Sequence, residues 1–130
     1  MTPKALLTLT VLPGRYAISR LDPSADVPHW SAKGDFMSIS RTPDELSVVC
    51  LEANVPSGIE SDRGWRIFKC EGPLDLALPG IMASLAEPLA EAGVPIFPIA
   101  THHTDYILIK EMHIDTAIRA LSGYGHAVRA

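Results

Sequence analysis

The stretch from Gly72 to Lys110 constrains the fold more than any other part of the chain, because helical and extended patterns alternate within it. Apolar residues recur at helical spacing over residues 78–92, and Pro79 stands at the first helical position, where a missing N–H does no harm. Residues 95–100 and 105–110 then read as strands joined by a polar loop. The stretch therefore predicts a helix followed by a strand pair.

Proline at position 88 conflicts with a continuous helix over residues 78–92. Inside a helix, proline removes one hydrogen bond and crowds the carbonyl of the residue four positions earlier, here Ser84, at a cost of about 3 kcal/mol. We therefore expect a kink or an early end at Pro88.

The flanking segments extend this pattern to a known motif. Residues 65–71 read as a strand, Ile114 to Leu121 as an amphipathic helix that ends near Gly123, and residues 126–129 as a last short strand. The order strand–helix–strand–strand–helix–strand is that of a ferredoxin-like unit. The second half of the chain is therefore predicted to be α+β.

The first half echoes the second with weaker helices. It contains strand patterns over residues 5–11, 16–21, 36–41 and 46–51, with at most a short helical turn at residues 28–31. A shift by 60 residues lays residues 38–49 on residues 98–109 and places Glu45 on Asp105.

We therefore expect two ferredoxin-like (βαββαβ) units in tandem, at residues 1–62 and 63–130, packed as one compact body. The helices of the first unit should be shortened. Residues 65–71 would have to close one unit and open the next, which implies that strands are shared or exchanged.

The strand at residues 105–110 is apolar on both faces. Ile107 and Ile109 lie on one face, and Tyr106 and Leu108 on the other. A lone two-layer unit covers one face, so the second face should meet the other half of the chain, a second chain, or both. Asp105 shares the parity of Ile107 and Ile109.

Charge and hydropathy exclude several classes of partner. The formal net charge is −4, with 11 Lys and Arg residues and no basic cluster, which argues against nucleic acid and anionic membrane surfaces. No apolar run approaches the roughly 20 residues of a membrane span, and the first residues lack the features of a signal peptide. We expect a cytoplasmic protein.

Reactive and metal-binding motifs are weak in this sequence. Cys50 and Cys70 each lie in an apolar run, which favours buried reduced thiols over a disulfide or a ligand pair. His102 and His103 are adjacent in a loop without a third ligand at useful spacing, so a solvated loop is favoured over a metal site. No nucleophile motif is present. We expect no catalysis, metal or cofactor.

A small-molecule site is indicated where the predicted helix begins. The free N–H groups of Gly80, Ile81 and Met82 can receive an anion, and the carboxylate of Asp105 can hold a cationic group. A zwitterion such as an amino acid needs both. Asp105 is equally well explained as a strand-end residue that bonds the loop backbone, and Glu45 is better explained as a turn carboxylate.

Several ordered motifs resemble those of the ACT domain. They are VPHW at residues 27–30, residues 36–50, GWRIFKCEGPLD at residues 64–75, residues 72–109 and GYGHAV at residues 123–128. The wider pattern resembles the small bacterial proteins with paired ACT units that are related to the CASTOR arginine sensors.

The resemblance implies a regulatory fold without catalysis, with an amino acid held at the interface between two ACT units. Carried onto this chain, it implies that the carboxylate of the ligand meets main-chain groups of Leu78, Gly80 and Ile81. Asp105 and the loop of Thr101 and Thr104 would face the ammonium group or the side chain.

Two functions follow as hypotheses. The first is a small-molecule sensor, with an amino-acid-like ligand, that changes its association with a partner. The second is a ligand-free module for protein interaction or homodimerisation.

Overall fold

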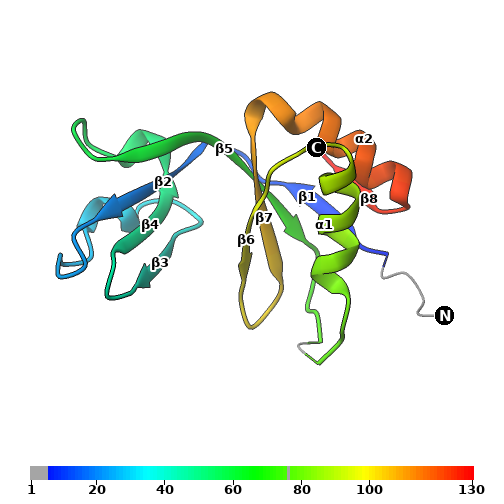
Figure 1. The fold of residues 1–130 in the computed structure, drawn as a ribbon, viewed down its shortest axis with the longest axis horizontal. Helices are drawn as coiled ribbons and strands as arrows, with labels where there is room; N and C mark the ends of the chain where they lie inside the picture. Colours follow the sequence, from blue (N-terminus) through cyan, green and yellow to red (C-terminus); the bar gives the residue numbers. More distant parts are fainter. Residues whose placement is uncertain (1–5, 76) are drawn as a thin grey trace. The chain divides into compact units, whose positions relative to one another are not determined.

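The computed structural model describes residues 6–75 and 77–130, and its elements follow the order that the sequence predicts (Figure 1). In chain order the elements are β1 (Thr8–Val11), β2 (Tyr16–Leu21), the 3-10 helix η1 (His29–Ala32), β3 (Ser38–Arg41), β4 (Leu46–Leu51), the 3-10 helix η2 (Glu52–Asn54), β5 (Ser61–Cys70), α1 (Ile81–Glu91), β6 (Phe97–Ala100), β7 (Asp105–Lys110), the 3-10 helix η3 (Glu111–His113), α2 (Ile114–Tyr124) and β8 (Ala127–Arg129). Within the described ranges, no helix has the length and hydrophobicity that a membrane span requires.

The chain folds as two compact units, which we name by their content. The strand unit is Gly14–Trp65, and the helical unit is formed by Arg66–Ala130 together with the described residues up to Pro13. The units meet between Trp65 and Arg66, whereas the expected boundary was between residues 62 and 63. The first strand, β1, was expected in the first unit but groups with the helical unit. The reason is pairing: β1 is antiparallel to β5, with Leu9 opposite Cys70, and parallel to β8.

The strand unit is a sheet with the order β3-β4-β2-β5. η1 lies between β2 and β3 in the chain, and η2 between β4 and β5, so the unit has the βαββαβ order with 3-10 turns where helices would stand. This confirms the prediction of shortened helices. Its core contains Ala17, Leu46, Val48 and Cys50, and Trp30 of η1 packs against it.

The helical unit has the strand order β6-β7-β5-β1-β8, and α1 and α2 pack against this sheet. β1 is inserted between β5 and β8, which would be neighbours in a simple ferredoxin-like unit. The fully buried side chains of its core include Phe68 of β5, Leu85 and Leu89 of α1, and Leu121 of α2. The mixed α+β, ferredoxin-like prediction is confirmed.

β5 belongs to both units, as the sequence implied. Its first part pairs with β2, with Tyr16 opposite Trp65, and its last part pairs with β1. The β2–β5 register shifts next to Gly64, whose φ of 81° lies in the left-handed region that favours glycine. The Gly64 N–H donates to a carboxylate oxygen of Glu52 at 2.8 Å, so the bulge is satisfied.

Both faces of β7 are buried, as its pattern predicted. Ile107 and Ile109 are fully buried in the core of the helical unit, and Leu108, which points to the opposite face, is also fully buried. Asp105 shares the parity of Ile107 and Ile109 and therefore points to the face on which the helices pack.

Of the kink or early end expected at Pro88, the early end is wrong, because α1 continues to Glu91. Pro88 has no N–H for the carbonyl of Ser84, but the Nε2 atom of His126 lies 2.8 Å from that oxygen. The Nδ1 atom of His126 accepts the backbone N–H of Leu7 at 3.0 Å, so Nε2 is the nitrogen that donates to the carbonyl of Ser84. A side chain distant in sequence replaces the missing helical bond.

The predicted alignment of Glu45 with Asp105 is wrong by one residue. The two hairpins pair Arg41 with Leu46 and Ala100 with Asp105 at equivalent positions. Leu46 therefore corresponds to Asp105, and Glu45 corresponds to the residue before it. The sequence match failed because it aligned the acidic residues, whereas the strand register is determined by backbone pairing.

Cys50 and Cys70 are free and buried, which confirms the sequence prediction. Burial, followed by the nearby carboxylates of Asp105 and Glu71, raises the pKa of Cys70 to about 12. Since the thiolate is the reactive form, we expect neither thiol to react with Ellman's reagent at pH 8 in the folded protein. Both should react after addition of denaturant. Rapid reaction of the native protein at Cys70 would contradict this prediction.

Candidate functional site

A small cavity in the helical unit brings together most of the predicted site residues. Its volume is about 190 Å³. It is lined by Leu74, Asp75, Leu78, Ile81, Ala100, Thr101, Thr104 and Asp105. Five of the six predicted residues line it. The sixth, Gly80, is not among the lining residues but is the N-cap of α1, directly before Ile81.

Three parts of the helical unit form the cavity walls. Ile81 is the first residue of α1, and Ala100 and Asp105 are paired where β6 ends and β7 begins. The loop between β5 and α1 supplies Leu74, Asp75 and Leu78. The helix start and the hairpin end meet because the helix packs on the face of the sheet to which Asp105 points.

The hairpin turn is held by its two threonines. The Thr101 hydroxyl donates to the carbonyl of Thr104 at 2.9 Å, and the Thr104 hydroxyl donates to the carbonyl of Cys70 at 2.7 Å. Thr104 is buried. The prediction placed Thr101 and Thr104 at the ligand, and the structure places both in the cavity wall, with their hydroxyl protons committed to the backbone.

The loop between β5 and α1 is anchored on the same turn. The Leu74 N–H donates to the carbonyl of His103 at 2.9 Å. A Cβ atom at Gly72 would lie 3.1 Å from both the His103 carbonyl oxygen and the Thr104 Cβ, so a larger residue would press on the neighbouring turn. Gly72 therefore allows this loop to lie close to the turn that borders the cavity.

Sequence reasoning missed Leu74, Asp75 and Ala100. The carboxylate of Asp75 accepts the N–H of Ala77 at 2.9 Å, an Asx turn that shapes the loop before the helix. An aspartate shortly before Pro-Gly is a usable sequence signal for such a turn. Leu74 and Ala100 carry no comparable signal, because small and apolar side chains line cores and cavities alike.

The cavity lies between the start of a helix and a carboxylate. Gly80 has φ 82° and α1 has no side-chain cap, so the first N–H groups of the helix lack intrahelical partners. They form the positive end of the helix dipole. The Asp105 carboxylate, for which we find no hydrogen bond to another described residue, supplies the negative group. Its volume of about 190 Å³ is smaller than the roughly 300–1,000 Å³ of pockets for drug-sized ligands.

Metal chemistry has no support in the described part of the chain. Residues 6–75 and 77–130 contain no group of three or more His, Cys, Asp or Glu side chains that could hold a metal ion.

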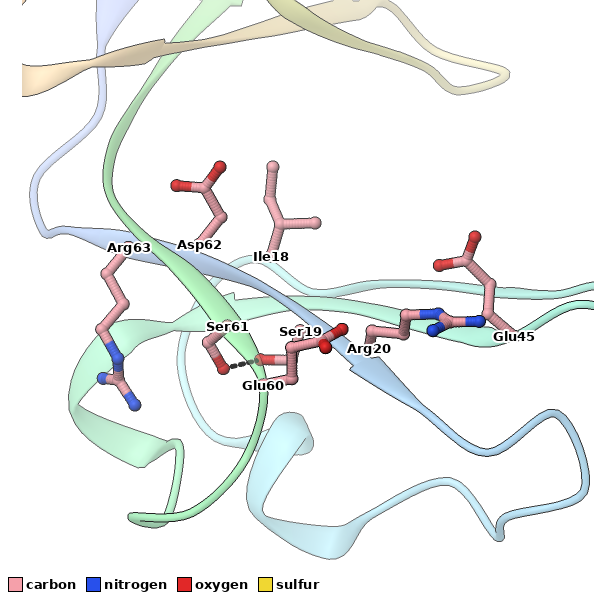
Figure 2. Close-up of a pocket in the computed structure, with 8 residues that line it drawn as sticks. All are labelled: Ile18, Ser19, Arg20, Glu45, Glu60, Ser61, Asp62 and Arg63. Atoms are coloured by element: carbon pink, nitrogen blue, oxygen red, sulfur yellow. Dashed lines mark hydrogen bonds between the residues drawn. The ribbon is translucent and has the colours of Figure 1, made fainter.

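A second hollow lies in the strand unit and has a volume of about 440 Å³. It is lined by Ile18, Ser19, Arg20, Glu45, Glu60, Ser61, Asp62 and Arg63 (Figure 2). The hydrogen-bond donors that line this hollow already bond to other groups of the protein. Ser19 and Ser61 bond each other at 2.8 Å, and the guanidinium groups of Arg20 and Arg63 donate to backbone carbonyls. It is the weaker candidate for a ligand site.

Family models match both parts of the chain. The model of the ACT domain matches residues 60–123, from the start of β5 into α2. A model that describes an N-terminal domain matches residues 14–58, which lie within the strand unit.

Solved structures resemble almost the whole chain. Protein Atu0741 from Agobacterium tumefaciens is 36% identical, with a TM-score of 0.91 over 95% of this chain and 92% of that protein. Protein VC0802 from Vibrio cholerae, of unknown function and described as a possible transport protein, is 21% identical, with a TM-score of 0.74 over 91% of this chain and 89% of that one.

The regulatory subunit of aspartate kinase from Thermus thermophilus is 16% identical, with a TM-score of 0.63 over 93% of this chain and 99% of that subunit. Like the Vibrio protein, it shows the fold alone. Residues 60–123 therefore match the ACT domain, and the chain belongs to the same protein family as Atu0741 of Agobacterium tumefaciens.

Proposed function

We propose that this protein is a regulatory amino-acid sensor that binds its ligand in the cavity of the helical unit. The observation that carries the proposal is the placement of the Asp105 carboxylate and the uncapped start of α1 on one cavity of about 190 Å³. The ACT domain model and the likeness to an aspartate kinase regulatory subunit support a regulatory role without catalysis.

Each wall has a distinct role in this proposal. The N–H groups of Gly80 and Ile81 receive the ligand's carboxylate, and Asp105 receives its ammonium group. The apolar side chains of Leu74, Leu78 and Ile81 contact its carbon atoms. Leu78 is 52% exposed in the structure, so a bound ligand would also cover apolar surface at the rim.

Binding acts on the protein through differential affinity. A ligand that binds the folded form stabilises it by RT ln(1 + [L]/Kd), which is about 2.7 kcal/mol at a hundredfold excess over Kd. The same free energy can favour one state of association with a partner over another.

A thermal-shift screen against the twenty amino acids tests the proposal. We expect a saturable rise in Tm with at least one of them. Asp105→Ala should weaken this binding by about 10- to 100-fold, because a hydrogen bond to a charged group contributes about 1.5–3 kcal/mol. Asp26→Ala, which removes an exposed carboxylate of the strand unit, is the matched control and should leave the shift unchanged.

A flat screen with a well-folded protein would contradict the sensor proposal. It would favour the alternative of a ligand-free interaction or homodimerisation module, with the exposed Leu78 at its contact surface. An Asp105→Ala variant that keeps the full shift would place the ligand elsewhere.

A further inference from the structure

We propose that the chain binds one ligand, in the helical unit, because the strand unit has Leu46 and Arg41 at the positions that Asp105 and Ala100 occupy in the helical unit. This inference rests on the proposed function, since it concerns the number and place of the sites for the same class of ligand. It follows from the register of the two hairpins.

The hairpins β3–β4 and β6–β7 are built alike (Figure 1). In each, a threonine N–H donates to the carbonyl three residues later at 2.9 Å, from Thr42 to Glu45 and from Thr101 to Thr104. The residue pairs next to these turns are Arg41 with Leu46 and Ala100 with Asp105. The side chains of such a pair lie on the same face of the sheet.

The strand unit has the core residue Leu46 at the position of the Asp105 carboxylate in the helical unit. It is fully buried, and the partly buried side chains of Leu21, Ala25 and Trp30 pack against its cluster. At the corresponding position, Asp105 is half-buried and lines a cavity. The strand unit therefore has an apolar contact at the position where a ligand's ammonium group would need a negative partner.

Arg41 replaces the small side chain of Ala100. Its guanidinium donates to the backbone carbonyls of Pro23 and Ala25, the latter at 2.8 Å. These carbonyls belong to the loop after β2, just as Leu74 and Asp75 belong to the loop after β5. In the strand unit the Arg41 guanidinium therefore binds the loop after β2. In the helical unit Ala100 is too small to reach the loop after β5 and leaves the space beside it open.

The anion-binding half of the site also differs between the units. The helical unit presents the start of α1, an α-helix of 11 residues, whereas the strand unit has the 3-10 helix η1, which has four residues. A single 3-10 turn aligns few peptide dipoles, so it offers little of the positive end that α1 provides.

Isothermal titration calorimetry of the full chain with each of the twenty L-amino acids tests the inference. We expect a stoichiometry near one for every amino acid that binds, and no second saturable event in the Asp105→Ala variant. A stoichiometry near two, or saturable binding whose affinity is unchanged by Asp105→Ala, would overturn the inference. No binding of any amino acid would overturn the proposed function, and with it this inference.

Two substitutions in the helical unit test whether Leu46 and Arg41 are the reason that the strand unit binds no ligand. Asp105→Leu and Ala100→Arg place the residues of the strand unit in the helical unit, and each should weaken binding at least tenfold while the circular dichroism spectrum is unchanged. Ala127→Arg introduces the same side chain on an exposed residue of β8 and should bind like the unaltered protein. Full affinity in both grafted variants would show that Leu46 and Arg41 do not close the second site.

Discussion

Replacing His126 with alanine should lower the free energy of unfolding by about 2–5 kcal/mol, because one buried and one partly buried backbone group lose their partners at once. His126 is 4% exposed, and its ring accepts from the N–H of Leu7 and donates to the carbonyl of Ser84. It also stacks on Tyr124, with the ring centroids 5.2 Å apart. No single smaller side chain can make both bonds.

Urea denaturation of the single and double variants checks this prediction. Pro88→Ala returns an N–H that can bond the carbonyl of Ser84, so His126→Ala should cost about 1 kcal/mol less in the Pro88→Ala background. His102→Ala, which removes an exposed histidine of the hairpin turn, is the control and should change stability little. Equal costs in the two backgrounds would show that His126 does not replace the bond missing at Pro88.

Replacing Gly72 with alanine should both destabilise the protein and weaken ligand binding. The added Cβ would lie 3.1 Å from the His103 carbonyl oxygen and 3.2 Å from the Leu74 nitrogen, so these neighbours must shift by a few tenths of an ångström. Overpacking of this kind costs about 1–3 kcal/mol. Denaturation and calorimetry should show a lower free energy of unfolding together with a weaker affinity.

Gly123→Ala is the matched control for Gly72→Ala. Gly123 lies within α2, and a Cβ there would meet nothing within 4 Å. Alanine is favoured over glycine in a helix by about 0.5–1 kcal/mol, so this variant should be slightly more stable and bind normally. If Gly72→Ala behaved in the same way, the packing of the two loops would not support the cavity.

The sequence predicted the order of the elements well, because hydrophobic period and turn residues are local. The helical spacing from Leu78, the alternation in β7 and the shared strand β5 were all visible in the chain. Five predicted site residues line one cavity. These residues meet because a ferredoxin-like unit brings the helix start and the hairpin end together, and each of these ends is recognisable in the sequence.

The sequence did not predict features that depend on contacts between distant residues. The insertion of β1 between β5 and β8 depends on strand pairing, which leaves no periodic signal. The alignment of Glu45 with Asp105 was off by one residue, because similarity of charge outweighed an unseen backbone register. Asp75 and Ala100 were missed because a cavity wall needs no particular residue type.

The sequence by itself determined which segments become strands and helices. It also supplied the two parts of the candidate site, the Asp105 carboxylate and the start of α1. The tertiary structure decided which of two similar hairpins keeps an open cavity, through Asp105 in one and Leu46 in the other. It also decided that α1 passes Pro88, since the partner of the Ser84 carbonyl comes from His126, 42 residues away. Local propensity determines elements, whereas packing and hydrogen bonds between distant residues determine which sites remain open.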